Sequence, residues 1–130
     1  MTEQANRMFE NIHRKDSLNF FASRGLDYER VKELVGLTNS DLSRAAQVAK
    51  SSVRFDERIP PVLKEQMELI AECCLLVADH FGGDAKKASL WFKIDNPMLG
   101  DVSPRDMIRC GRLSKLQRFV VGALTEADRR

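Results

Sequence analysis

The feature that most limits the folds open to this 130-residue chain is a long apolar stripe near its middle. After Pro60 and Pro61, apolar residues recur at steps of three or four as far as Phe81, which is the spacing of one face of an α-helix. The stripe consists of Leu63, Met67, Ile70, Cys74, Val77 and Phe81, and it is widened by Leu69, Cys73 and Leu76. So broad an apolar face predicts a central helix, from about Pro61 to Phe81, that other helices contact on two sides. Gly82 and Gly83 are expected to end this helix.

Helical spacing also dominates the rest of the chain, and apolar and polar residues do not alternate as they do in strands. We therefore expect an all-α fold. Capping residues are expected where further helices begin, at Asp27, at Thr38 or Asn39, at Asp84 and at Ser103. The expected helices span about 3–24, 28–35, a short stretch after 39, 50–56, 85–92 and 104–110, with a final helix that ends near 124.

Residues 37–54 have the pattern of a helix-turn-helix, in which small or apolar residues pack where two short helices cross. The residues that fill this role are Leu42, Ala46, Val48 and Val53. The second helix would place Arg54 in the major groove of DNA, where an arginine pairs bidentately with guanine. Phosphates would be held by its polar and basic neighbours, which are Lys50, Ser51, Ser52 and Arg58.

Two observations limit this DNA-binding interpretation. Gln47 stands at the turn, where a positive φ would cost a non-glycine residue about 1 kcal/mol. Asp56 and Glu57 follow the second helix and would repel phosphate, so the basic residues could equally form a solvated surface. One such helix also makes few contacts, so specific binding to DNA would require a homodimer.

The last third of the chain contains its only tryptophan, Trp91, followed by an Asn96-Pro97 turn and a Ser103-Pro104 helix start. Trp91 is expected to bury its large apolar ring in the core. Together with Ala88, Leu99-Gly100 and Gly111, these residues resemble, in order and spacing, the toxin-binding domain of the Xre/MbcA/ParS-type bacterial antitoxins. Residues 37–54 are similar to the Xre-type helix-turn-helix that precedes this domain in the same family.

The resemblance implies an antitoxin of a type II toxin–antitoxin pair, acting without a cofactor. Its C-terminal module would cover the active site of a cognate toxin, typically of the NAD-degrading RES class, and its helix-turn-helix would bind operator DNA and repress the operon. The implied organisation is an N-terminal helical extension (1–25), a helix-turn-helix region (26–60), a central helix (61–83) and a toxin-binding domain (84–130). The residues expected to face the toxin are Asn96, Asp101, Arg105, Arg109 and Arg112.

The three arginines of that set lie at helical spacing, so we expect them on one face unless Gly111 interrupts the helix. The overall charge gives no further indication of a partner, because 21 basic residues stand against 19 acidic ones. A row of cations is often only a solvated face. A free-standing DNA-binding regulator and a protein–protein adaptor therefore remain as alternative functions.

No arrangement of residues indicates catalysis, and we expect a protein that is not an enzyme. His13 and His80 are far apart in the sequence, and the cysteines lack the spacing of a zinc site. Cys110 is expected to be a small core residue. Three cysteines without a secretory signal favour the cytoplasm. The longest uncharged apolar run is too short for the ~20 residues that cross a bilayer, so we expect no membrane span.

Overall fold

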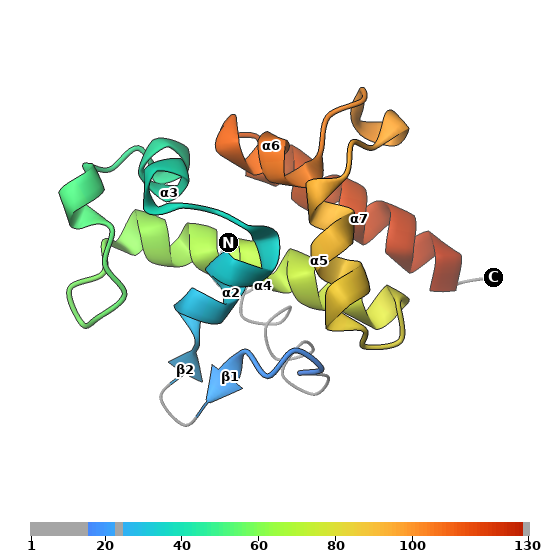
Figure 1. The fold of residues 1–130 in the computed structure, drawn as a ribbon, viewed down its shortest axis with the longest axis horizontal. Coiled ribbons are helices and arrows are strands. Elements are labelled where there is room, and N and C mark those ends of the chain that lie inside the picture. Colours follow the sequence, from blue (N-terminus) through green and yellow to red (C-terminus); the bar gives the residue numbers. More distant parts are fainter. Residues whose placement is uncertain (1–15, 23–24, 129–130) are drawn as a thin grey trace.

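The computed structural model describes residues 16–22 and 25–128, and the chain is mainly helical there (Figure 1). The prediction of an all-α fold is confirmed; the only strands in the described ranges are two of two residues each. The α-helices are α2 (Tyr28–Val35), α3 (Asn39–Ala46), α4 (Pro61–His80), α5 (Ala85–Lys93), α6 (Pro104–Arg109) and α7 (Leu113–Asp128). The shorter elements are the strands β1 (Phe21–Ala22) and β2 (Gly25–Leu26) and the 3₁₀ turns η1 (Lys50–Ser52) and η2 (Pro97–Leu99).

The predicted helix starts are confirmed by their hydrogen bonds. In each case the cap side chain accepts a hydrogen bond from a backbone N–H in the first turn, and the four caps are Asp27, Thr38, Asp84 and Ser103. Thr38 forms a full capping box, because the carboxylate of Asp41 also accepts from the Thr38 backbone N–H at 2.9 Å. At the other end of α2, Gly36 takes the left-handed conformation, with φ of 82°.

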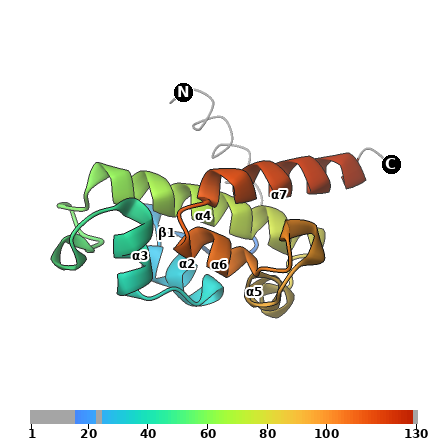
Figure 2. The same ribbon diagram turned by 90° about the horizontal axis from the view of Figure 1, so that it is seen from above.

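Helix α4 is the middle layer of the fold (Figure 2). Helix α7 packs along one side of it, and α2 and α5 contact it on the other. The apolar stripe predicted for this helix is buried, since Leu63, Met67 and Ile70 have no exposed surface. The buried residues form one hydrophobic cluster that runs from Leu18 to Val120. The two halves of the chain therefore share a single core built on α4.

The predicted helix over residues 3–24 falls partly outside the described residues, which begin at Asp16. Within the described part the prediction is wrong, because residues 16–22 form a turn followed by β1. The carboxylate of Asp16 accepts hydrogen bonds from the backbone N–H groups of Phe20 (2.8 Å) and Phe21 (3.0 Å). A short aspartate side chain can hold the backbone in such a turn, and this competes with helix formation.

The second helix of the predicted helix-turn-helix is absent. Only η1 is helical, and residues 53–55 that follow it have no regular secondary structure, with Val53 in an extended conformation. Val53, Phe55 and Ile59 are all partly buried against the core. Val53 and Phe55 are two residues apart, a spacing that puts side chains on one face of an extended segment but not of a helix. The ring of Phe55 stacks on Tyr28 with centroids 5.4 Å apart. Packing of this segment against α2 therefore overrides the helical pattern.

The turn after α3 has the positive φ at Gln47 that is costly for a residue other than glycine. Gln47 adopts a left-handed conformation, with φ of 56° and ψ of 46°. The turn is closed by the hydroxyl of Ser43, which donates to the carbonyl of Val48 at 2.6 Å. This hydrogen bond spans Gln47 and holds its strained backbone conformation in place.

The variant Gln47→Gly should raise the free energy of unfolding by about 1 kcal/mol, because glycine adopts positive φ without the steric cost that other residues have. Chemical denaturation monitored by circular dichroism measures this change. Ala49→Gly is the matched control, since Ala49 is exposed with a φ of −60° and should gain nothing from glycine. Equal effects of the two substitutions would contradict the argument.

A carboxyl group lies inside the core, where α4 packs on α7. Glu72 has no exposed surface, and its Oε1 accepts a hydrogen bond from Nε2 of Gln117 at 3.3 Å. Its other oxygen, Oε2, has no hydrogen-bond partner in the described structure. Burial raises the pKa of Glu72, and the Gln117 hydrogen bond offsets this only in part.

Because its pKa is raised on folding, Glu72 holds a proton more strongly in the folded chain than in the unfolded one. Its contribution to stability is therefore favourable below the unfolded pKa of about 4.5 and is lost as the pH rises through the folded value. Glu72→Gln should remove this decline and raise stability at pH 7 by about 1 kcal/mol. Denaturation curves between pH 4 and pH 8 test this, with the exposed Glu65→Gln as control. A less stable Glu72→Gln variant at pH 7 would refute it.

Candidate protein-binding surface

The loop between α5 and α6 is a compact, hydrogen-bonded unit. Asn96 uses its side-chain oxygen to accept from the Met98 backbone N–H at 2.9 Å, and its own N–H donates to the carbonyl of Val102 at 3.0 Å. Gly100 and Asp101 both have positive φ, of 79° and 64°, and turn the chain back. Since the backbone is fixed, the loop holds Met98 out from the surface with 77% of it exposed.

This loop forms one wall of a groove, and α6 and the first turns of α7 form the rest. The groove has a volume of about 420 Å³ and is lined by Met98, Leu99, Gly100, Val102, Met107, Arg112, Lys115 and Phe119. We call it the Phe119 groove. Its floor is apolar, and Arg112 and Lys115, both exposed, add positive charge. An apolar groove with a charged border is typical of a protein-binding site.

A smaller hollow of about 130 Å³ lies on the other side of Phe119, where α7 meets α5 and the end of α4. It is lined by Val77, His80, Phe81, Trp91, Asn96, Phe119, Val120, Ala123 and Leu124. The prediction that Trp91 is a core residue is wrong, because its ring is only partly buried and lines this hollow. The buried ring is that of Phe92, on which Trp91 packs edge-on at 5.1 Å. The two hollows make one apolar surface around Phe119.

The residues that were predicted to bind the toxin lie on different sides of the molecule. Asn96 and Arg112 lie at this surface, in the smaller and the larger hollow respectively. Asp101 is exposed at the bend of the loop. Arg105 and Arg109 face the α2–α3 side instead, so the expectation of three arginines on one face is wrong. The reason is Gly111, which takes a φ of 75° and redirects the chain between α6 and α7.

The sequence analysis did not single out Met98, Lys115 and Phe119 as site residues. Met98 carried a usable signal, because it is a large apolar residue inside a turn flanked by proline and glycine. Phe119 carried none, since it stands among apolar residues of a helix and looks like part of the core. Only the relative placement of α6, α7 and the loop exposes its ring.

Arg109 has a structural role that its position in the sequence does not reveal. Its Nε lies 3.2 Å from Oδ2 of Asp41 in α3, and its Nη1 donates to Asp106 at 3.0 Å. Burial acts to raise the pKa of Asp41, but hydrogen bonds from Thr38 and Arg109 outweigh it and lower the pKa overall. The same carboxylate thus caps α3 and ties it to α6.

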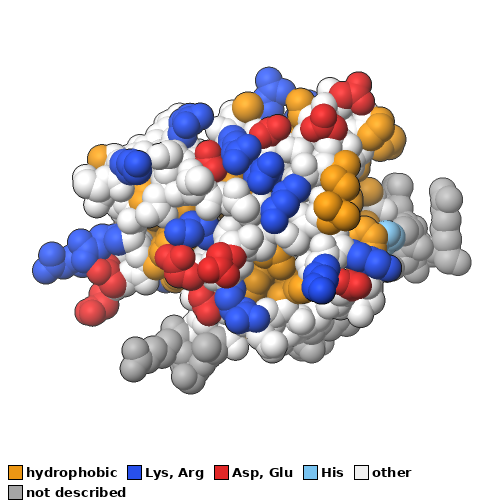
Figure 3. Space-filling model, in the orientation of Figure 1, with side chains coloured by type: hydrophobic (Ala, Val, Ile, Leu, Met, Phe, Trp, Pro, Cys, Tyr) orange, Lys and Arg blue, Asp and Glu red, His pale blue; other side chains and the backbone are white. Residues whose placement is uncertain are grey.

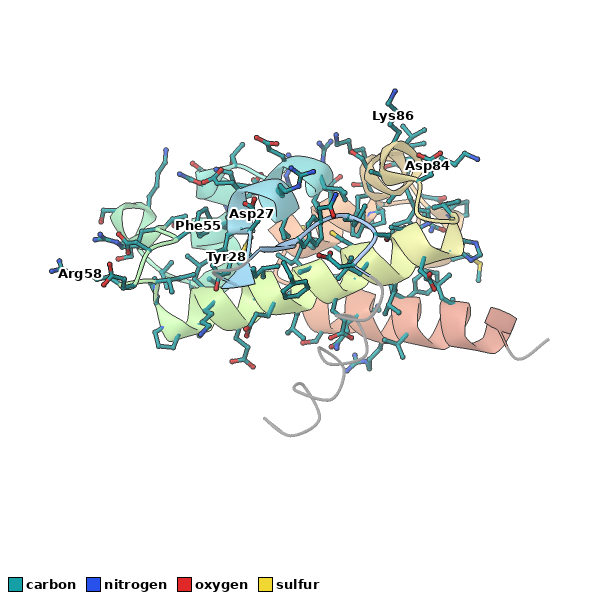
Figure 4. All side chains as sticks on the ribbon, turned by 90° about the horizontal axis from the view of Figure 1, so that it is seen from below. Asp27, Tyr28, Phe55, Arg58, Asp84 and Lys86 are labelled. Atoms are coloured by element: carbon teal, nitrogen blue, oxygen red, sulfur yellow. The ribbon has the colours of Figure 1, made fainter. Side chains whose placement is uncertain are left out.

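The residues predicted to bind DNA do not form a helical reading face. Lys50, Ser51 and Ser52 make up η1, a single 3₁₀ turn. Arg54 is paired with Asp56, since its Nε donates to Oδ1 at 2.8 Å and its Nη2 contacts Oδ2. The hydrogen bonds from Arg54 hold the pKa of Asp56 down to about 2. Arg58 projects from the end of the molecule, away from the Tyr28–Phe55 stack (Figure 4).

The described residues hold no group of three or more histidine, cysteine or acidic side chains placed to bind a metal ion. Cys73 and Cys74 are fully buried, and burial raises the pKa of both thiols well above the usual range. Cys110 is exposed, so its prediction as a core residue is wrong. Helix length and hydropathy over the described segments give no candidate membrane span.

The fold and the groove together define an all-α protein with an exposed apolar hollow on its surface. Comparison with known proteins assigns it to no family: no family model matches the chain, and neither a curated protein nor a solved structure gives a significant match. The resemblance to the antitoxins therefore depends on the sequence motifs alone. What the chain binds has to be argued from its surfaces.

The Arg109–Asp41 contact predicts a specific loss of stability. Arg109→Met keeps the aliphatic stem but removes the charge, and it should lower the free energy of unfolding by about 1–2 kcal/mol at pH 7 because the contact is partly buried. Asp41 has a lowered pKa, so its contribution is present above its unfolded pKa of about 3.8 and is lost as the pH falls. The variant should therefore lose less stability than the wild type on acidification.

Thermal unfolding at pH 3 and pH 7 measures both effects. Arg112→Met is the matched control, because Arg112 is exposed and its side chain makes no hydrogen bond or ion pair with the described residues. It should change the free energy of unfolding by less than about 0.5 kcal/mol. The same loss in both variants would mean that the ion pair does not join α3 to α6.

Proposed function

We propose that the chain is the antitoxin of a bacterial type II toxin–antitoxin pair and that it neutralises its toxin by binding through the Phe119 groove. The observation that carries the proposal is the exposed apolar surface around Phe119. It is built mainly from residues 88–124, the segment whose motifs resemble the toxin-binding domain of the Xre/MbcA/ParS-type antitoxins. A partner that covers this surface removes Met98, Phe119 and Trp91 from water, which favours binding.

The inhibition would be steric and would need no cofactor. The loop that carries Met98 is held by its own hydrogen bonds, so it loses little conformational freedom when a partner binds. Arg112 and Lys115 border the groove and would attract a partner that carries acidic residues at the matching positions. By the same resemblance, the expected toxin is of the NAD-degrading RES class, and the antitoxin would block access to its pocket.

Repression of the operon through operator DNA is a separate part of the expectation, and we do not extend the proposal to it. A recognition helix should place its N-terminal residues in the major groove. Residues 50–52 form only one 3₁₀ turn, and the side chain of Arg54 is hydrogen-bonded to the carboxylate of Asp56. The DNA-binding regulator and the protein–protein adaptor remain as alternatives. A gel-shift with the upstream DNA separates these two.

Met98→Asp should weaken toxin binding about 10- to 100-fold, because it places a charge where an exposed apolar side chain meets the partner. The protein product of the neighbouring toxin gene is the ligand, and its affinity is measured by calorimetry. In cells, co-expression of the wild-type chain should restore growth inhibited by the toxin. The variant should restore it less well.

Val62→Asp is the matched control, since Val62 is also an exposed apolar residue but lies at the start of α4 and lines neither hollow. It should leave the affinity unchanged. If Met98→Asp binds as tightly as the wild type, the toxin uses another surface. If the neighbouring gene encodes no toxin and the chain restores no growth, the adaptor or regulator function is favoured.

A further inference from the structure

A second surface lies on the outer face of α5, and the Phe119 groove does not include it. Ala88 and Phe92 turn inward and are fully buried, and Ser89 and Trp91 between them are half-buried, so the exposed residues lie on the opposite face of the helix. The outward set combines cations and large apolar side chains, and it consists of Lys86, Leu90, Lys93 and Ile94. None of the four lines either hollow around Phe119. Helix α5 also lies on the opposite side of α4 from α7 (Figure 2).

The apolar residues of this face are unusually exposed. Leu90 is 57% exposed and Ile94 is 52% exposed, and they stand four residues apart. Ile94 is the extended residue that ends α5, so it stands about one helical turn beyond Leu90. Lys86 precedes Leu90 by one turn and projects away from the molecule (Figure 4). The face thus combines two exposed apolar side chains with two lysines, Lys86 and Lys93, on the same flank of the helix.

Two cations meet at the end of this face, over the backbone of Gly36. A Cβ atom placed on Gly36 would lie 2.9 Å from Nη1 of Arg105 and 3.0 Å from Cε of Lys93. The hydroxyl of Ser89 donates to the carbonyl of Leu34 at 2.7 Å and holds α5 against the end of α2. The absence of a side chain at Gly36 therefore gives the two cations room to converge.

These two cations have no acidic partner in the described parts of the chain. Neither Lys93 nor Arg105 forms a hydrogen bond or ion pair with a described side chain, and Nε of Arg105 is buried without an acceptor. The carboxyl end of α2 supplies only about half of an elementary negative charge against two positive ones. A row of Lys and Arg side chains, with hydrophobic side chains beside it, crosses this face of the molecule (Figure 3). An anionic group between Lys93 and Arg105 would neutralise their positive charge.

We propose that this face binds an acidic amphipathic helix of a second protein. A carboxylate of that helix would lie between Lys93 and Arg105, and its apolar residues would cover Leu90 and Ile94. The exposed apolar residues favour a protein partner over a nucleic acid, because a phosphate backbone would leave the side chains of Leu90 and Ile94 in water. The face is independent of the proposed toxin-binding groove, so the chain can engage two partners.

The probe is a fluorescein-labelled amphipathic peptide with glutamates on both sides of a leucine stripe, titrated with the full chain in a polarisation assay. Lys93→Glu and Leu90→Ala should each weaken its binding by about tenfold or more. Lys64→Glu is the matched control, because it makes the same charge change at an exposed residue of α4 that lines neither hollow around Phe119. It should leave the affinity within about twofold. Thermal unfolding confirms that each variant is folded.

The same peptide with lysines in place of its glutamates should not bind, and a short DNA duplex should not compete at physiological salt. Two results would overturn the proposal. One is wild-type affinity for the acidic peptide in either variant of the α5 face. The other is DNA binding that Lys93→Glu abolishes and Leu90→Ala leaves intact, which would reassign the two cations to phosphate.

Discussion

The burial of the middle of α4 on all its sides is the constraint on which the rest of the structure depends. Five consecutive residues, Ala71 to Leu75, are each at most 3% exposed, and five residues pass around the whole circumference of a helix. The other α-helices of the described ranges have 16 residues or fewer, and α2, α3, α5 and α7 all contact α4. Neither half of the chain can bury its apolar residues without this helix. Both halves are therefore expected to unfold together.

Two proposed binding surfaces are attached to this one core, and both expose apolar side chains of helices that pack against α4. Helices α5 and α7 lie on opposite sides of α4 (Figure 2), and each turns apolar side chains inward while keeping others exposed. The ion pair between Arg109 and Asp41 holds α6 against α3, which fixes the wall of the groove relative to the first half of the chain. A partner thus meets a surface that is already formed.

Local chemistry made most of the fold predictable from the sequence. The caps Asp27, Thr38 and Asp84 and the stripe of α4 marked the helices correctly, because these signals involve residues within one or two turns. The second helix of the helix-turn-helix failed because Phe55 stacks on a residue far from it in the sequence. The predicted arginine face failed at Gly111, where one backbone conformation changes the direction of the chain. The groove itself required the placement of three separate elements, which no local pattern encodes.

The cysteines give the chain an uneven response to oxidation. Cys73 and Cys74 are neighbours on a helix, so their side chains diverge, and both are sealed in the core. An oxidant reaches them only when the core opens. Cys110 stands on the surface after α6, where it meets solvent and other molecules freely. In an oxidising medium, any covalent cross-link would join two copies through this residue while the interior stays chemically untouched.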